Sequence, residues 1–513
     1  MMKRFISLLL AVLLLPCIAL GENVQDSLVI GLVSSRTYEI RPLIPQERDV
    51  VSLYGLVYES LVTIDDNGVP QPLLADNWQE TGGGGTWTFT LRENVTFSDG
   101  TPLRAQDVAA SGNYILALAN ADVEDKGFYQ NMRYMVSSFE APNEQTVVVK
   151  AKRDYYGVLY SMTFPVVHES QTEVAGALGT GPYRIQEFVP GSHMWLVANQ
   201  NWWQTQPQVQ EIMAMLYPNN NALITDYEYG RVDTAITRSV AAAQYKSGIN
   251  SLSIAYSTRQ LEVLLLNNAQ FEFEDVRVRQ AFRYAINKEL IAQNVYMGMT
   301  QNADTPVPSD SWLYYDQEST FTYNPEKAIQ LLEEAGWTDS DDDNVMDRVV
   351  DGKLRKLHVR LYVYEDPEND VRFETANMIA DMLAQIKVEV KVTAMTYGEE
   401  LEALEAGSFD MALCAFQMDV VPDYGFFLRK GNGQNYCRYP SADMTSLIDS
   451  LRTQEDQNDF AYTTGVIQQL FANDAPFICL FYRSGAILTR KVFTTVRSIR
   501  EFELLRGIQD FGR

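Results

Sequence analysis

The stretch TWTFTLRENVTFSDGTPLRAQDV (86–108) constrains the fold more than any other part of this chain. Its first six residues alternate polar with apolar side chains, which is the period of a half-buried β-strand, and Val95 and Phe97 continue the pattern. Asp99-Gly100 is a turn dipeptide, because glycine tolerates the positive φ of a tight reversal. The segment AQDVAASGNYILALANA (105–121) then predicts a helix. Strand, turn and helix are thus expected to follow one another directly in this stretch.

The N-terminus predicts export. Lys3 and Arg4 form a short positive region, the apolar run FISLLLAVLLLPCIAL follows, and small residues precede an expected cleavage after Gly21. A membrane anchor is one alternative, but the run is shorter than the roughly 20 apolar residues of a spanning helix. A lipidated Cys17 is another, although proline precedes this cysteine where such sites prefer a small residue. We expect a soluble, exported mature chain in the periplasm or at the cell surface.

The size and charge of the chain narrow its classes of partner. A chain of 513 residues is too long for one hydrophobic core and suggests two or three domains. Its net charge of -26 is spread along the sequence and disfavours nucleic acid or an anionic membrane surface as a partner. Cys414, Cys437 and Cys479 would remain after cleavage. A disulfide between two of them stays open, but we expect three buried thiols.

A search for catalytic and metal-binding motifs predicts that the chain is no enzyme, with no cofactor and no metal site. It has no G-x-S-x-G elbow and no phosphate-binding loop, and its three histidines lie far apart in sequence. The stretch DSDDDNVMD (339–347) places aspartates at alternating positions. A calcium loop needs glycine at its sixth position and glutamate at its twelfth, where this chain has Asn344 and Val350. We interpret the stretch as a solvated acidic turn, with calcium binding as the alternative.

Several motifs resemble one protein family. PLLADNW (72–78) and the stretch that follows from Thr86 resemble the signature of the family 5 extracellular solute-binding proteins, the dipeptide, oligopeptide and nickel binders that serve ABC importers. Further stretches are similar to the family's in the same order along the chain: GTGPYRIQEFVPG (179–191), DYEYGRVDTAIT (226–237), FEDVRVRQAFRYAINKELIAQNVYMG (273–298) and YNPEKAIQLLEEAGW (323–337). These motifs are structural, and we interpret helix 276–286 as an amphipathic scaffold with its arginines off the apolar face.

The sequence departs from the family pattern at three places. Arg104 stands where a helix-capping threonine or serine is usual, so the cap of the helix from 105 must be made differently. DSDDDN replaces the family's D-G-D-G turn, and IRP (40–42) replaces its early D-P near the ligand cleft. The last departure leaves the ligand open.

The resemblance implies a periplasmic-binding-protein-like α/β fold of type II, cluster C. Two lobes would be joined by hinge strands near residues 262 and 476, with an extra subdomain in lobe one. The boundaries implied are a signal peptide at 1–21, lobe one at 22–55, the extra subdomain at 56–177, lobe one again at 178–262, lobe two at 263–475 and a return to lobe one at 476–513.

The same resemblance implies a receptor that captures peptides by closing its lobes. It would act as a monomer and deliver them to ABC permease transmembrane subunits with cytoplasmic ATPases. The alternatives are a sensor or chaperone-like binding protein not coupled to a transporter, and a binder of a non-peptide solute such as a nickel chelate or a sugar.

The candidate ligand contacts also follow from the resemblance. FDMALCAFQMDVVPDYGFFL (409–428) resembles the family's F-D-(x)₄-G-W-(x)₂-D stretch, which places Phe416 at the tryptophan, Gln417 beside it and Asp419 on the acidic position. In peptide binders that aspartate pairs with the α-amino group, and Asp423 is the alternative after a small shift of register. Two other segments, QERD and PFICLFYRSG, would face the cleft, and they contribute Gln46, Arg48, Tyr482 and Arg483. Both arginines would suit a ligand carboxylate.

Overall fold

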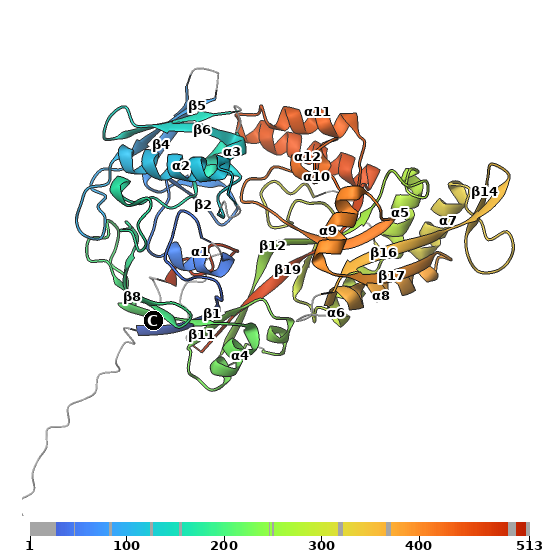
Figure 1. Cartoon of the computed structure of the whole chain (residues 1–513), viewed down its shortest axis with the longest axis horizontal. Helices are drawn as coiled ribbons and strands as arrows, with labels where there is room; N and C mark the ends of the chain where they lie inside the picture. Colours follow the sequence, from blue (N-terminus) through green and yellow to red (C-terminus); the bar gives the residue numbers. More distant parts are fainter. Residues whose placement is uncertain are drawn as a thin grey trace, which may run out of the picture.

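The computed structural model describes residues 27–45, 47–81, 85–123, 127–152, 156–245, 247–248, 251–316, 322–365, 371–490 and 499–508. The expected signal peptide, its cleavage site, Cys17 and Gln46 lie outside these residues. The described chain forms two lobes side by side (Figure 1).

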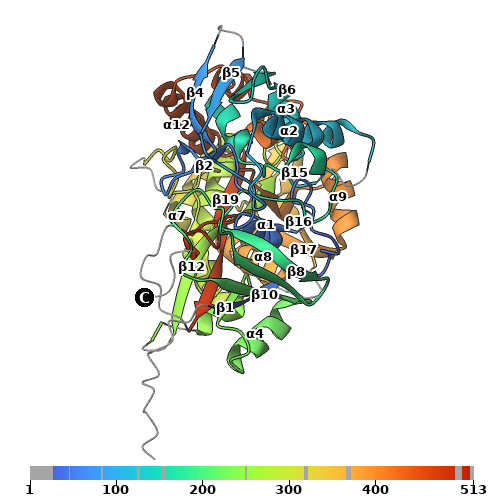
Figure 2. The same cartoon turned by 90° about the vertical axis from the view of Figure 1, so that its left-hand side faces the viewer.

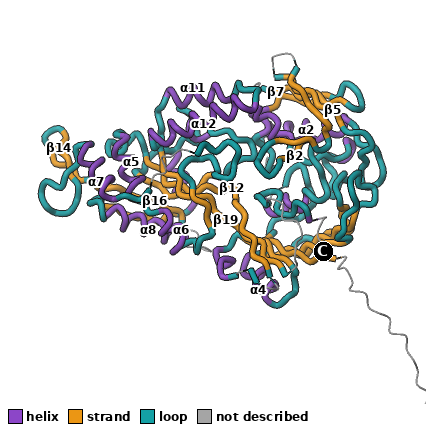
Figure 3. Tube along the Cα trace, turned by 180° about the vertical axis from the view of Figure 1, so that it is seen from behind, coloured by secondary structure: helices purple, strands orange, loops and turns teal. Residues whose placement is uncertain are grey.

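One mixed sheet runs through both lobes (Figure 3). Its strand order is β17-β16-β18-β12-β19-β11-β1-β10-β9-β8, with β13 beside β19. The strands are β1 (Ser27–Val33), β8 (Tyr183–Val189), β9 (His193–Ala198), β10 (Glu211–Tyr217), β11 (Thr234–Thr237), β12 (Leu252–Leu266), β13 (Thr300–Asn302), β16 (His358–Tyr364), β17 (Glu389–Met395), β18 (Met411–Gln417) and β19 (Phe477–Thr489).

The two longest strands connect the lobes. β12 has 15 residues and β19 has 13, and they pair antiparallel from Leu252 opposite Thr489 to Leu265 opposite Phe477. Figure 2 shows them running next to each other through the centre of the molecule. Their register shifts near Glu262, so the ladder is irregular where the strands pass between the lobes. The predicted crossing at 262 falls within β12, and that at 476 falls one residue before β19.

Lobe one is built on the first strand of the described chain. β1 pairs in parallel with both β10 and β11, and its Ile30 and Leu32 are fully buried, because a parallel strand is covered on both faces. β1 is therefore a largely buried strand at the centre of lobe one. α1 (Arg48–Tyr54) precedes β2 (Val62–Ile64), and α4 (Asn220–Glu228) packs against β1.

The segment from β2 to β7 forms a separate small sheet and its helices. The sheet order is β4-β5-β7-β6, and β2 pairs with β3 beside it. The elements are β3 (Pro70–Pro72), β4 (Ala75–Glu80), β5 (Thr86–Leu91), α2 (Ala105–Asn120), α3 (Met132–Met135), β6 (Val136–Glu140), β7 (Thr146–Ala151) and the 3-10 helix η1 (Tyr156–Met162). This is the region that the sequence predicts as an extra subdomain, and the name is kept for these elements.

The stretch at 86–108 folds as its pattern predicts. The apolar side chains of β5 are buried at 4% exposure or less, Gly100 has φ +90°, and α2 starts at Ala105. The carboxylate of Asp107 accepts a hydrogen bond of 2.8 Å from the amide of Arg104, so the helix is capped by an acidic residue in its own first turn. This is how the chain replaces the missing threonine or serine.

Lobe two surrounds the other end of the central sheet. Trp337 and Phe282 are among its largest fully buried side chains. Its further elements are α5 (Val276–Ala285), α6 (Lys288–Asn294), α7 (Pro325–Glu334), β14 (Asp347–Val350), β15 (Lys353–Lys356), α8 (Val371–Ala384), α9 (Tyr397–Ala406), α10 (Gly425–Leu428), α11 (Ala442–Leu451) and α12 (Gln457–Asp474).

Helix α5 corrects the prediction about its arginines. Arg279 and Arg283 are buried, at 7% and 5% exposure, although both were expected away from the buried face. Arg279 donates to the carbonyl oxygens of Asp474 and Ala475, and Arg283 donates to that of Ala472, all at the C-terminal end of α12. Helix C-termini leave carbonyls without partners inside the helix, and a guanidinium satisfies several of them at once.

The lobes also meet beside the extra subdomain. The amide of Tyr156 donates to the carbonyl of Gln454 at 2.7 Å, and Trp312 Nε1 donates to the Tyr160 hydroxyl at 2.9 Å. Trp312 further stacks on Phe460 of α12, with ring centroids 6.4 Å apart. Figure 1 shows α11 and α12 next to the extra subdomain. In this structure the lobes are therefore in contact at a second place, away from β12 and β19.

The three cysteines beyond the expected cleavage site are free thiols. Cys437 and Cys479 are buried and Cys414 is partly buried. Burial raises the pKa of Cys437 and of Cys479 to about 12, so both stay protonated near neutral pH. The expectation of separate thiols is confirmed.

Candidate ligand-binding site

Two cavities lie between the parts of the molecule, and both reach Asp419. The larger, of about 930 Å³, is lined by residues 130, 131 and 133–135 of the extra subdomain, by Gln260 of β12 and by lobe two. The smaller, of about 310 Å³, is lined by lobe one, the extra subdomain and the C-terminal segment, defined here as residues 499–508. Asn131 and Val421 also line both cavities. A solute held at Asp419 would therefore touch both lobes.

Asp419 is held by neutral donors. It follows the end of β18 by two residues, and its carboxylate accepts from Asn131 Nδ2 at 2.7 Å and from the amide of Val421 at 3.3 Å. Arg259 binds the backbone carbonyl of Asp419 at 2.7 Å and forms no ion pair with its carboxylate. Among the described residues, no lysine or arginine is ion-paired with this carboxylate. Its negative charge is thus open to a cation from outside.

Asp423 has a different environment. Its carboxylate binds the guanidinium of Arg452 with both oxygens, at 2.6 to 3.0 Å, and also accepts from the amide of Gly425 at 2.8 Å. Both side chains of this ion pair are 14% exposed. The charge is neutralised within the protein, so Asp423 lines the larger cavity as part of a closed pair.

Phe416 and Gln417 line the larger cavity with Asp419. Phe416 is 7% exposed and stacks on Phe427 with centroids 4.9 Å apart, while its ring also meets Phe477 at 5.9 Å. Gln417 is exposed. The structure therefore brings these three predicted residues together at one cavity, and their contact with a ligand stays a prediction.

Three other predicted contacts do not line the two cavities, and the fourth, Gln46, lies outside the described residues. Arg48 forms an ion pair with the buried Glu501, and Arg483 lies over the ring of Tyr296, 5.8 Å from its centroid. Tyr482 is buried and donates to the carbonyl of Pro306 at 2.6 Å. None of Arg48, Arg483 and Tyr482 is among the described residues that line either cavity. Their ligand roles stay predictions without support from this geometry.

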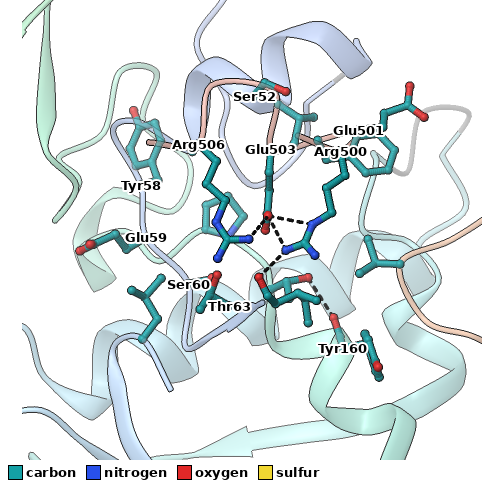
Figure 4. Close-up of a pocket in the computed structure, with 18 of the residues that line it drawn as sticks. Ser52, Tyr58, Glu59, Ser60, Thr63, Tyr160, Arg500, Glu501, Glu503 and Arg506 are labelled. Carbon is teal, nitrogen blue, oxygen red and sulfur yellow. Dashed lines mark hydrogen bonds and ion pairs between the residues drawn. The ribbon is translucent and has the colours of Figure 1, made fainter. Parts of the chain in front are cut away.

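The smaller cavity has polar walls that the sequence did not indicate. Figure 4 shows the guanidinium groups of Arg500 and Arg506 on either side of Glu503. The buried Glu59 accepts hydrogen bonds from Trp203 Nε1 at 2.8 Å and from Thr180 Oγ1 at 2.9 Å. Burial raises the pKa of Glu59 to about 7, although these donors act against the shift.

The larger cavity contains two further charged groups that sequence reasoning missed. Glu400 of α9 lines its lobe-two wall, and Arg133 of α3 lines the opposite wall. Arg133 donates to the carbonyl of Ala119 and to the hydroxyl of Tyr134, which are neutral acceptors. Neither residue stands in a motif, and only their tertiary position marks them.

The acidic turn at 339–347 brings carboxylate oxygens of Asp339, Asp341 and Asp347 within 4.8 Å of one another. Lys387 binds Asp339 at 2.8 Å and Lys356 binds Asp341 at 3.0 Å, so lysines offset part of the negative charge. The turn is held by these ion pairs, and calcium binding stays the untested alternative.

The fold and these cavities define a class of protein. Two α/β lobes share a central sheet through two long strands, and a cavity between the lobes presents the carboxylate of Asp419, which has no ion-pair partner among the described residues. Within the described residues, no helix has the length and apolarity that crossing a membrane requires. This is the architecture of a protein that binds a solute between its lobes.

Comparison with known proteins identifies the family. The family described as bacterial extracellular solute-binding proteins, family 5 Middle, matches residues 69–436, and the chain belongs to it. It is 25% identical over 482 residues to the oligopeptide-binding protein AppA of Bacillus subtilis, covering 89% of this chain and 86% of that protein. It is 24% identical over 449 residues to the dipeptide-binding protein of Escherichia coli, covering 80% of each.

Solved structures show the same fold. The nickel ABC transporter protein from Bacillus halodurans aligns with a TM-score of 0.78 at 22% identity, over 92% of this chain and 97% of that one. The two-lobed α/β fold and the family implied by the sequence motifs are confirmed.

Proposed function

We propose that this chain is the extracytoplasmic receptor of an ABC importer and that it binds short peptides through their α-amino group. One observation carries the ligand class: the Asp419 carboxylate lies between the lobes with only neutral hydrogen-bond donors around it. An ammonium group enclosed there loses its water and needs a carboxylate partner. Similarity to an oligopeptide-binding and a dipeptide-binding protein supports a peptide as the source of that amine.

Ligand capture would proceed by hinge closure. β12 and β19 are the strands common to both lobes, and bending at their irregular register near Glu262 would change the angle between the lobes. Asn131 reaches Asp419 from the opposite lobe, so this pairing exists only when the lobes are together. A peptide amine at the same carboxylate would favour the closed state, because its full set of contacts forms only there.

The remaining parts of the proposal follow from membership of the family. The closed, loaded protein would dock as a monomer on permease transmembrane subunits that are driven by cytoplasmic ATPases. The chain would perform no chemistry on the peptide, and it would be exported by cleavage after Gly21. A sensor or chaperone-like role without a transporter is distinguished by uptake: cells that lack this protein should lose uptake of the peptide it binds.

The test uses an N-terminally blocked and a free peptide on the mature protein. Calorimetry should show that trialanine binds and that N-acetyl-trialanine binds poorly. Asp419→Asn should weaken binding of the free peptide by about 2–5 kcal/mol, the usual loss when one partner of a buried charged pair is removed.

The matched control is Asp381→Asn, which changes an exposed aspartate on α8 of lobe two. It should bind trialanine as the unaltered protein does. Equal affinity for blocked and free peptides would instead refute the peptide proposal and favour a non-peptide solute, such as a sugar or a chelated metal.

A further inference from the structure

Glu400 is a second acidic group of the larger cavity that the proposed function leaves unused. It lies in the first turns of α9, which begins after the Thr396 cap, and it is 5% exposed. Its Oε1 atom is buried and has no hydrogen-bond partner among the described residues. A buried carboxylate oxygen without a donor is costly, and in a cavity it indicates a position that a ligand completes.

The charges beside Glu400 do not neutralise it. Arg372 is close enough to influence it, but this guanidinium binds both oxygens of Glu262, at 3.0 and 3.1 Å. Glu262 is 1% exposed and also accepts from Gln260 at 3.0 Å, so the Arg372–Glu262 pair is complete. The group formed by Glu262, Arg372 and Glu400 therefore has two carboxylates and one guanidinium, and Glu400, which lines the cavity, is the excess carboxylate.

The rest of the cavity supports binding of a cation beside Glu400. The rings of Tyr364 and Tyr397 line the same wall and meet edge to face with centroids 5.8 Å apart. Aromatic faces attract cations and cover the apolar stem of a long side chain. The guanidinium of Arg133, on the opposite wall, already binds Ala119 and Tyr134. Asp419 lines the same cavity, so one ligand can reach both carboxylates.

We propose that Glu400 binds a second cationic group of the ligand, so that the cavity selects peptides with a positively charged side chain in addition to the α-amino group. This inference rests on the proposed function, in which Asp419 binds the α-amine. The ammonium or guanidinium group of the ligand's lysine or arginine would form an ion pair with Glu400, next to the Arg372–Glu262 pair. The aliphatic part of that side chain would lie along Tyr364 and Tyr397.

The ionisation of Glu400 gives this selection a pH dependence. Burial raises the pKa of Glu400 to about 7, although Arg372 and the backbone of Tyr364 act against the shift. A cationic side chain favours the ionised carboxylate, so binding below neutral pH releases a proton from Glu400. The preference for a cationic side chain should therefore increase with pH through this range, by up to about 30-fold between about pH 5.5 and 8.

The experiment compares Ala-Lys-Ala with Ala-norleucine-Ala by calorimetry on the mature protein. These peptides share the α-amine and differ in the side-chain ammonium. The lysine peptide should bind at least about tenfold more tightly near pH 8, with the preference shrinking toward pH 5.5. Glu400→Gln should remove the preference and its pH dependence, while Glu402→Gln, an exposed glutamate on the same helix, should keep both.

Each outcome decides one of the two proposals. Equal binding of both peptides to the unaltered protein would overturn the role of Glu400 and leave peptide capture at Asp419 intact. A lysine preference that survives in Glu400→Gln would also overturn it. Failure of both peptides to bind would refute the proposed function and with it this inference. Proton release that is greater for the lysine peptide, measured in two buffers at about pH 6.5, would support Glu400 independently of the variants.

Discussion

Substitution of Glu501 should destabilise the protein more than its position near the C-terminus suggests. Its side chain is fully buried and contacts two guanidinium groups, those of Arg48 and Arg238, the latter at 2.9 Å. Its other oxygen accepts from the amide of Arg259 in β12 at 2.6 Å. Asp49 binds Arg238 at 2.6 Å, so two arginines and two acids form a balanced, partly buried cluster around the buried Glu501. Although burial acts to raise it, the two guanidinium groups lower the pKa of Glu501.

Glu501→Gln keeps the shape of the side chain but removes its charge, which leaves two partly buried guanidinium groups facing the single carboxylate of Asp49. Breaking a buried pair in this way costs about 3–5 kcal/mol. Urea unfolding followed by tryptophan fluorescence measures the loss. The control is Glu503→Gln in the same segment, where the Glu503 side chain is 30% exposed against 0% for Glu501, so the loss should be smaller, about 1 kcal/mol.

A second substitution tests the cause. Arg48→Met, added to Glu501→Gln, removes one uncompensated cation and should recover part of the lost free energy of unfolding. Two results would refute the view that charge balance in this cluster holds the C-terminal segment in place. One is a loss of less than about 1 kcal/mol in the free energy of unfolding of Glu501→Gln. The other is a double variant whose loss equals the sum of the two single losses.

Three further outcomes are expected. Gly179→Ala should cost about 1–3 kcal/mol, because its Cβ would lie 2.0 Å from the backbone oxygen of Val57; an unchanged midpoint in urea would refute this. The pKa of Glu59 is raised from 4.5 to about 7, so protonation of Glu59 stabilises the folded protein fully below about pH 4.5, and this stabilisation is lost above about pH 7. The free energy of unfolding, measured over this pH range, should fall by roughly 3 kcal/mol in the unaltered protein, and this fall should be absent in Glu59→Gln. Trp312→Phe removes the hydrogen bond to Tyr160 between the lobes and should weaken peptide binding by about 0.5–1.5 kcal/mol, which calorimetry would detect.

Local patterns were enough to predict much of the frame. The alternation of polar and apolar residues in β5 shows which of its side chains face inward, because this pattern depends only on neighbours within a few residues. The arginines of α5 show the limit of this reasoning. Their burial depends on the carbonyls at the end of α12, almost 200 residues further along the chain, and a helical wheel records no such acceptor.

The residues of the candidate site also differ in whether the local sequence could predict them. Phe416, Gln417 and Asp419 follow one another on and after a single strand, so a motif places them at the cavity together. Glu400 lines the same cavity from helix α9, and Asn131 lines it from the other lobe. No sequence motif around either residue indicates a ligand site. Arg48 looks from sequence like a free cation, and its partner Glu501 is brought to it only by tertiary folding.

Arg259 explains how the anchor position and the hinge are connected. Its backbone amide binds Glu501, which belongs to the partly buried charge cluster of lobe one, and its guanidinium binds the carbonyl of Asp419 after β18. Both bonds originate on β12, the strand that the lobes share, close to the shift in register. A change in the angle of β12 would therefore move Asp419 relative to the lobe-one cluster. Since the Asp419 carboxylate has neutral partners alone among the described residues, a ligand cation binding there acts on the part of the fold that closure would move.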